Sequence, residues 1–135
     1  MKREELLNEL EQDLKVDTRQ LLNEAADNSK LYAKWLRYYS DVKREWLKAN
    51  MALSRVKKEK LDWLNGRSDE VCEYAYERSE IKTVLEADIE YQRSFSSVEL
   101  AGIRLDICKS ALDAIKSRGF SIKNAIDMRM LESGK

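Results

Sequence analysis

Histidine and proline are both absent from this 135-residue chain, which has only four glycines and two cysteines. Histidine is the commonest general base and the commonest metal ligand, so its absence argues against an enzyme or a metal site. Cys72 and Cys108 form no Cys-x-x-Cys pair, which disfavours a disulfide framework or a zinc site and fits a reducing compartment. Glycine-rich phosphate loops and Gly-x-Ser-x-Gly motifs are also missing. We therefore expect no catalytic residues, no metal and no cofactor.

Long apolar runs are missing too. The chain begins Met-Lys-Arg-Glu-Glu, and its uninterrupted apolar stretches are only a few residues long. A membrane span needs about 20 predominantly apolar residues, and a signal peptide needs a shorter apolar core. The sequence predicts no signal peptide, no membrane association and a soluble, cytoplasmic protein.

The formal charge is zero, with 25 basic and 25 acidic side chains, but the charges are sorted into blocks. Residues 1–28 carry four basic and eight acidic side chains, whereas residues 43–67 carry eight basic and three acidic ones. Residues 69–90 carry two basic and eight acidic, and residues 104–129 carry six basic and three acidic. A chain sorted in this way can present a basic face locally even though its total charge is zero.

A long helix is expected over residues 17–66, because no proline or glycine interrupts residues 18–64. Apolar residues recur there with alternating spacings of four and three, as in a helix that lies along another helix. Asp17 with Gln20, and Val16 with Leu21, resemble a capping box and hydrophobic staple at its start. Asn65-Gly66 supplies the residue types that end a helix. The seam is Leu21, Ala25, Asn28, Tyr32, Trp35, Tyr39, Val42, Trp46, Ala49, Leu53, Val56, Lys60 and Trp63.

Two seam positions are polar, Asn28 and Lys60. A polar residue in such a seam usually sets the register or the oligomeric state, and this is the expected role of Asn28. Lys60 instead belongs to the most basic part of the chain, which favours a binding partner over packing.

Three further segments complete the predicted organisation. Residues 1–16 read as a short amphipathic helix with an acidic outer face, followed by a linker. Residues 67–95 read as an acidic connector with a short helix from Ser79 to Ala87. Residues 96–133 read as a second long helix, and Ser96 with Glu99 forms a capping-box pattern that predicts its start.

The second long helix has a wide apolar stripe, more than one neighbouring helix needs. We predict that it drives self-association. Gly119 either lies within this helix, which the continuing register favours, or ends it, with Ser121 capping a separate short helix. The predicted assembly residues are Leu105, Cys108, Leu112, Ile115, Ile122 and Ile126.

Together these segments predict a single all-α domain over residues 1–135. Its expected form is an elongated helical hairpin of two long coiled-coil-like helices. A monomer of this shape would leave much of both apolar stripes in water, so we expect a homo-oligomer, most simply a closed ring.

The basic cluster near the end of the first long helix is the sharpest candidate site. Cations beside an aromatic ring suit single-stranded nucleic acid, whose phosphates need neutralising and whose bases stack without a sequence code. Trp63 can either pack or stack, and the cluster can instead be an exposed face that only keeps a structural coiled coil soluble. Glu73, Glu77 and Glu80 form an acidic ladder that is better explained as a solvated face than as a metal site. The candidate DNA-binding residues are Arg55, Lys57, Lys58, Lys60, Trp63 and Arg67.

Several stretches resemble the UvsY family, the recombination mediator proteins of T-even-like bacteriophages. The densest match runs from Ser110 to Lys123 and continues through Asp127-Met-Arg129 to the terminal Glu132-Ser-Gly-Lys135. Further matches are Glu24-Ala-Ala, Leu31-Tyr-x-Lys-Trp-Leu36, Leu61-Asp62, Asn65-Gly-Arg67 and Ser79-Glu-x-Lys-Thr-Val-Leu85. The resemblance covers essentially the whole chain.

The resemblance implies a non-catalytic accessory factor of homologous recombination in the infected bacterial cytoplasm. It implies a homo-oligomeric ring that binds single-stranded DNA and helps the phage recombinase displace the phage single-strand-binding protein. The family's DNA-binding motif reads Leu-Lys-Ala-Arg-Leu-Asp-Tyr, and Lys57 to Trp63 stand in its place. Lys58 keeps the motif's lysine, and Lys60 retains the arginine's charge without its planar fork. Glu59 departs from the motif's small residue and adds a negative charge.

Overall fold

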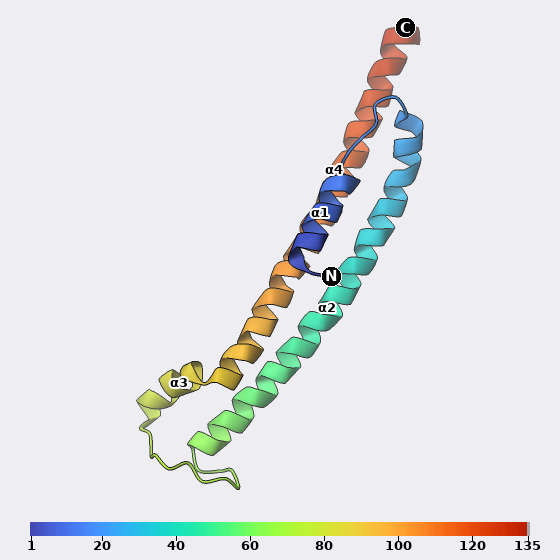
Figure 1. Ribbon diagram of the computed structural model, residues 1–135. Helices are drawn as coiled ribbons and strands as arrows, with labels where there is room; N and C mark the ends of the chain where they lie inside the picture. Colours follow the sequence, from blue (N-terminus) through green and yellow to red (C-terminus); the bar gives the residue numbers. More distant parts are fainter. Residues whose placement is uncertain (135) are drawn as a thin grey trace. The chain divides into compact units, whose positions relative to one another are not determined.

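The computed structural model describes residues 1–134, and within that range it contains four α-helices and no strand. They are α1 (Arg3–Asp13), α2 (Leu21–Leu64), α3 (Arg78–Ala87) and α4 (Ile89–Gly134) (Figure 1). The all-α prediction is confirmed. Among the described residues, no helix combines the length and the apolar character that crossing a membrane would require. Lys135, the last residue of the terminal match, lies outside the described residues.

Helix α2 ends as predicted but begins later than the pattern around Asp17 suggested. The Asp17 carboxylate accepts a hydrogen bond from the Arg19 backbone N–H (3.0 Å), which also lowers the pKa of Asp17. Asp17 therefore stabilises the turn before the helix instead of capping it, and the helix starts at Leu21. At the other end Gly66 has a φ of 74°, and the Arg67 N–H donates to the carbonyl of Asp62 (2.7 Å). This left-handed glycine closes the helix as Asn65-Gly66 predicts.

Helix α4 begins at Ile89, seven residues before the capping box expected at Ser96. Ser96 lies inside the helix, so that predicted start is wrong. Asp88 caps instead, because its Oδ2 accepts a hydrogen bond from the Tyr91 backbone N–H (3.0 Å). Asp88 also ends α3, so no loop separates the two helices. The sequence therefore has no turn residues that mark the boundary between them. The predicted short helix exists as α3, and α4 continues through Gly119, which confirms the favoured alternative.

The chain packs as two compact units, each described by itself. The first comprises Met1–Val42 and Ile103–Lys135, and the second comprises Lys43–Gly102. In the first unit, α1 and the N-terminal half of α2 pack with the C-terminal part of α4, and α2 and α4 run antiparallel there. The buried apolar side chains of this unit are Leu6, Leu21, Trp35, Val42, Leu105, Cys108, Ala111, Ile115 and Ile122.

Some acidic side chains of α1 form hydrogen bonds and ion pairs with α2 of the same chain. The indole N–H of Trp35, which has no exposed surface, donates to Asp13 Oδ2 (2.8 Å). Lys34 lies 2.6 Å from the same oxygen and 3.6 Å from Glu9. A hydrogen bond with Glu9 also raises the pKa of Tyr38 to about 12. These bonds hold α1 against α2 while Leu6 is buried.

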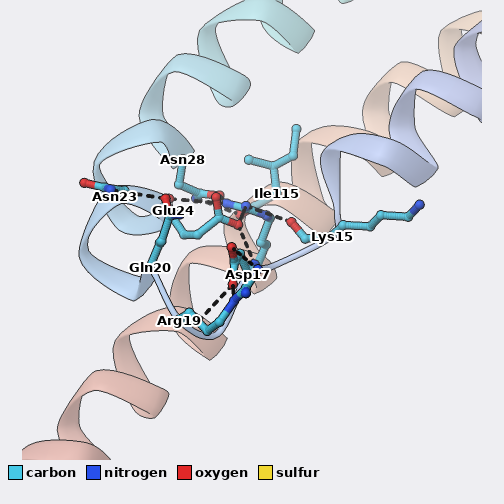
Figure 2. Close-up of polar contacts among 9 residues, drawn as sticks. Lys15, Asp17, Arg19, Gln20, Asn23, Glu24, Asn28 and Ile115 are labelled. Atoms are coloured by element: carbon cyan, nitrogen blue, oxygen red, sulfur yellow. Dashed lines mark hydrogen bonds and ion pairs between the residues drawn. The ribbon is translucent and has the colours of Figure 1, made fainter.

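A buried polar network surrounds Arg118, a charged side chain of α4 that is only 7% exposed. Figure 2 shows Lys15, Glu24, Asn28 and Ile115, which take part in this network. Its guanidinium donates to Glu24 Oε2 (2.8 Å), to Asn28 Oδ1 (2.8 Å) and to the carbonyl of Lys15 (3.0 Å). The Asn28 amide donates to the carbonyl of Ile115 (3.0 Å). Asn28 thus fixes the register of α2 against α4 within one chain, a form of the role predicted for it.

Most of the apolar stripe of α4 is buried against other helices of the same chain. Leu105, Cys108, Ile115 and Ile122 are between 0% and 5% exposed. Leu112 and Ile126 are half-buried. A side chain with no exposed surface in one chain has none to offer a second copy. The four buried members are therefore core residues of the single chain, and the prediction that they also form assembly contacts stays a prediction.

The second unit contains the C-terminal half of α2, all of α3 and the start of α4. Its buried apolar side chains are Leu64, Leu85, Val98 and Ala101. Gly102 of α4 faces Trp46 of α2, and a Cβ at this position would lie 3.8 Å from the indole nitrogen, an ordinary van der Waals contact. Trp46 also has the Lys43 ammonium 4.8 Å from its ring centre.

Candidate nucleic-acid interface

The last three turns of α2 carry five of the six candidate DNA-binding residues. Arg55, Lys57 and Lys58 are exposed, whereas Lys60 and Trp63 are half-buried. Arg67 follows the glycine that ends the helix and is also exposed. The structure thus gathers the predicted residues at one end of one helix, within the second unit.

The cations do not all face the same way. Successive residues of an α-helix are rotated by about 100°, so Arg55 and Lys58 share one face. Val56 and Leu64, the more buried positions of this stretch, lie on the opposite side, which packs against the rest of the unit. Lys60 lies on that inward side. The exposed face therefore offers Arg55 and Lys58, whereas Lys57 is exposed on the side of the helix that it shares with Lys60.

Lys60 has two carboxylate partners. Its ammonium lies 3.0 Å from Glu90 Oε2 and 3.4 Å from Asp88 Oδ1, at the start of α4. Hydrogen bonding to Glu90, helped by the charge of Asp88, raises the pKa of Lys60. Lys58 pairs with Asp62 one turn further along α2 (2.7 Å).

The remaining cations of the cluster are not paired in this way. Among residues 1–134, Arg55, Lys57 and Arg67 have no carboxylate within ion-pair distance. Their charges face water, where phosphates of a strand could replace their counterions directly.

Trp63 lines a groove of about 400 Å³ between the end of α2 and α3. Lys60 and Asp88 stand at this groove, and Val84 and Leu85 form part of its apolar wall. Because Trp63 is half-buried, part of its ring packs and part faces water. The position is compatible with stacking on a base, which requires an accessible ring face.

The acidic ladder Glu73, Glu77 and Glu80 lies in and before α3. In the described part of the chain, no three His, Cys, Asp or Glu side chains come close enough together to hold a metal ion. Glu77 and Glu80 instead form a capping box at the start of α3.

Sequence reasoning missed Asp88 and Glu90 as partners of Lys60. They are 28 and 30 positions from Lys60 along the chain, so no helical spacing links them. The only available signal was the acidic block 69–90 next to the basic block 43–67, which indicates complementary charge without assigning pairs. Arg118 was missed for a related reason, since its partners lie in the first 28 residues.

Comparison with known proteins gives consistent matches over the whole chain. The family model "Recombination, repair and ssDNA binding protein UvsY" matches residues 9–135. The recombination protein uvsY of Enterobacteria phage T4 is 45% identical over 137 residues, covering all of both chains. A crystal structure of the bacteriophage T4 recombination mediator protein UvsY, in lattice type II, has a TM-score of 0.94 at 45% identity and covers 99% of each chain. The same protein in lattice type III has a TM-score of 0.82 at 37% identity, covering 99% of this chain and 100% of that one.

Proposed function

The chain belongs to the UvsY family of recombination, repair and single-stranded-DNA-binding proteins, and from this we propose that it is a recombination mediator. In this proposal it binds single-stranded DNA as a homo-oligomer and helps load the phage recombinase onto DNA covered by the single-strand-binding protein. It acts in the cytoplasm of the infected bacterial host and catalyses no reaction itself.

The observation that supports DNA binding most directly is the exposed basic end of α2. Arg55, Lys57 and Lys58 present three cations within four positions, and the half-buried Trp63 follows five positions after Lys58. Phosphates bind such cations by releasing counterions, and bases stack on the ring without sequence preference. This combination fits single-stranded DNA better than a duplex groove.

Assembly strengthens this binding. Several apolar side chains of α4 remain exposed on the side away from the core, and a helix buries such a face by packing it against another helix. We assign the contacts between copies to this face and to the half-buried Leu112 and Ile126. A ring would present one basic cluster per copy, so linked sites would gain avidity without new contacts. The exposed side chains are Ile103, Phe120, Met128 and Leu131.

Contacts with the recombinase and the single-strand-binding protein belong to the same proposal. The acidic block 69–90 is the candidate surface, because Asp69, Glu70 and Glu73 are exposed there. In α1, by contrast, Glu9 and Asp13 are engaged with Lys34 of the same chain. The block 4–13 therefore offers less free negative charge to a partner.

The test is a titration of a fluorescent single-stranded oligonucleotide at several salt concentrations. Wild-type affinity should fall steeply with salt, and the double variant Arg55→Ala with Lys58→Ala should flatten the slope of log K against log salt. The expected change is about 0.7 per lost phosphate contact, or about 1.4 for both.

The matched control is Arg44→Ala with Lys48→Ala, which removes two exposed cations elsewhere on α2. An unchanged slope in the Arg55 and Lys58 variant would remove this face from the DNA site. A wild-type protein that binds no oligonucleotide even at low salt would favour the alternative, a structural coiled-coil protein without a nucleic-acid role.

A further inference from the structure

The place where Lys60 would meet a phosphate is already occupied by carboxylates of the same chain. Glu90 Oε2 and Asp88 Oδ1 lie 3.0 Å and 3.4 Å from its ammonium. A carboxylate and a phosphate both bind an ammonium through anionic oxygens at hydrogen-bond distance. Lys60 is 28% exposed, so a strand can approach it, but the two carboxylates stand in its way.

The two carboxylates are held differently. Asp88 is fixed, because its other oxygen caps α4 through the Tyr91 N–H (3.0 Å). Glu90 is 60% exposed, and Lys60 is its one ion-pair partner in the described chain. Glu90 can therefore swing into water without breaking a helix cap, while Asp88 stays.

We propose that Asp88 and Glu90 form an intramolecular competitor for the DNA phosphate at Lys60, with Glu90 as the displaceable arm. This inference rests on the proposed function, because it requires the basic end of α2 to bind single-stranded DNA. In the DNA-free chain Glu90 occupies Lys60. When a strand binds the basic end of α2, a phosphate reaches Lys60 from the side of Lys57 and replaces Glu90 there.

Such a competitor has a limited strength. Partly exposed ion pairs contribute little because water screens them, so removing one should change affinity by a small factor, about 2- to 5-fold. The contribution should shrink with salt, because screening weakens the pair. The competitor would therefore lower affinity most at low ionic strength, where non-specific binding by the cations is strongest.

The experiment compares Glu90→Gln with Glu99→Gln in oligonucleotide titrations at about 50 and 200 mM salt. Both variants remove one exposed carboxylate from α4, but Glu99 has no ion-pair partner in residues 1–134. Glu90→Gln should bind about 2- to 5-fold more tightly than wild type at the lower salt, with a smaller gain at the higher salt. Glu99→Gln should stay near wild type.

A second pair of variants tests whether the effect runs through Lys60. In a Lys60→Gln background, Glu90→Gln should give no gain, because the group for which carboxylate and phosphate compete is gone. A gain that persists there, or equal gains in Glu90→Gln and Glu99→Gln, would show a general charge effect and overturn the inference.

Weaker binding by Glu90→Gln would also overturn the inference, because Glu90 would then position Lys60 for DNA.

All of these outcomes require that the wild-type protein binds the oligonucleotide. If the wild-type protein binds no oligonucleotide at either salt concentration, the proposed function fails, and this inference fails with it. The two failures are thus distinguishable by the wild-type titration alone.

Discussion

The two compact units use the same kinds of residue for different ends. The first buries its charge: Arg118 is 7% exposed and pairs with Glu24 through a 2.8 Å contact. The second leaves its charge near water: Lys60 and Glu90 form a pair in which the side chains are 28% and 60% exposed. The first unit also holds most of the buried apolar side chains.

This difference teaches which interactions hold the chain together and which are available to a partner. A buried ion pair cannot be broken by removing one member without stranding the other. An exposed pair exchanges readily with water, salt or another anion. The first unit therefore serves as the scaffold, and the second carries the exchangeable cations.

The largest expected effect separates the core of the first unit from its exposed surface. Ile115→Asp places a carboxylate where the native side chain has no exposed surface, so we expect a loss of more than about 4 kcal/mol and an unfolded chain. Phe120→Asp, on the same helix at 69% exposure, should leave the helical content unchanged. Circular dichroism checks folding, and a sizing column checks assembly.

Phe120→Asp should elute as a smaller species if the exposed face of α4 joins the copies. A folded Ile115→Asp protein would contradict the assignment of this residue to the core. A Phe120→Asp protein that keeps the native mass would remove Phe120 from the contacts between copies.

The second comparison is between the stability losses caused by replacing Arg118 of the first unit and Lys60 of the second. Arg118→Met should cost about 3–5 kcal/mol, because Glu24 and Asn28 lose the guanidinium that satisfies them away from water. Lys60→Met should cost no more than about 1 kcal/mol, because its partners can turn to water. Urea unfolding of both variants measures the difference. Equal losses would mean that Lys60 is as structural as Arg118.

Two glycines inside α4 should respond to alanine in opposite directions. Gly119→Ala should destabilise by about 1–3 kcal/mol, because its Cβ would lie 2.7 Å from the Asn28 amide nitrogen. That amide is held in place by Arg118 and the Ile115 carbonyl, so it has little freedom to move. Gly102→Ala meets only the Trp46 ring at 3.8 Å and should stabilise the helix by about 1 kcal/mol.

Thermal or urea unfolding of these two variants, measured beside wild type, shows directly whether each substitution raises or lowers the free energy of unfolding. The same sign in both would mean that the contact between Asn28 and Gly119 is looser than the structure places it.

Features that depend on neighbouring residues could be predicted from the sequence. The end of α2 at Asn65-Gly66 follows from the glycine's left-handed backbone, and the short helix α3 was expected within one residue of its start. Arg55, Lys57 and Lys58 lie at one end of α2 because they fall within four consecutive positions of the sequence. The start of α4 was missed because Asp88 ends one helix and caps the next, leaving no turn residues to mark the boundary.

The sequence by itself therefore determined that the chain is helical, where α2 ends and which turns of α2 are basic, because capping and periodicity act over a few residues. Only the tertiary structure decided that Lys60 faces Glu90, that Arg118 joins Glu24 and Asn28, and that Ile115 is core. Those pairings join residues 30 to 94 positions apart. They depend on which faces of the helices meet, and an apolar stripe looks the same in sequence whether its own chain or another copy covers it.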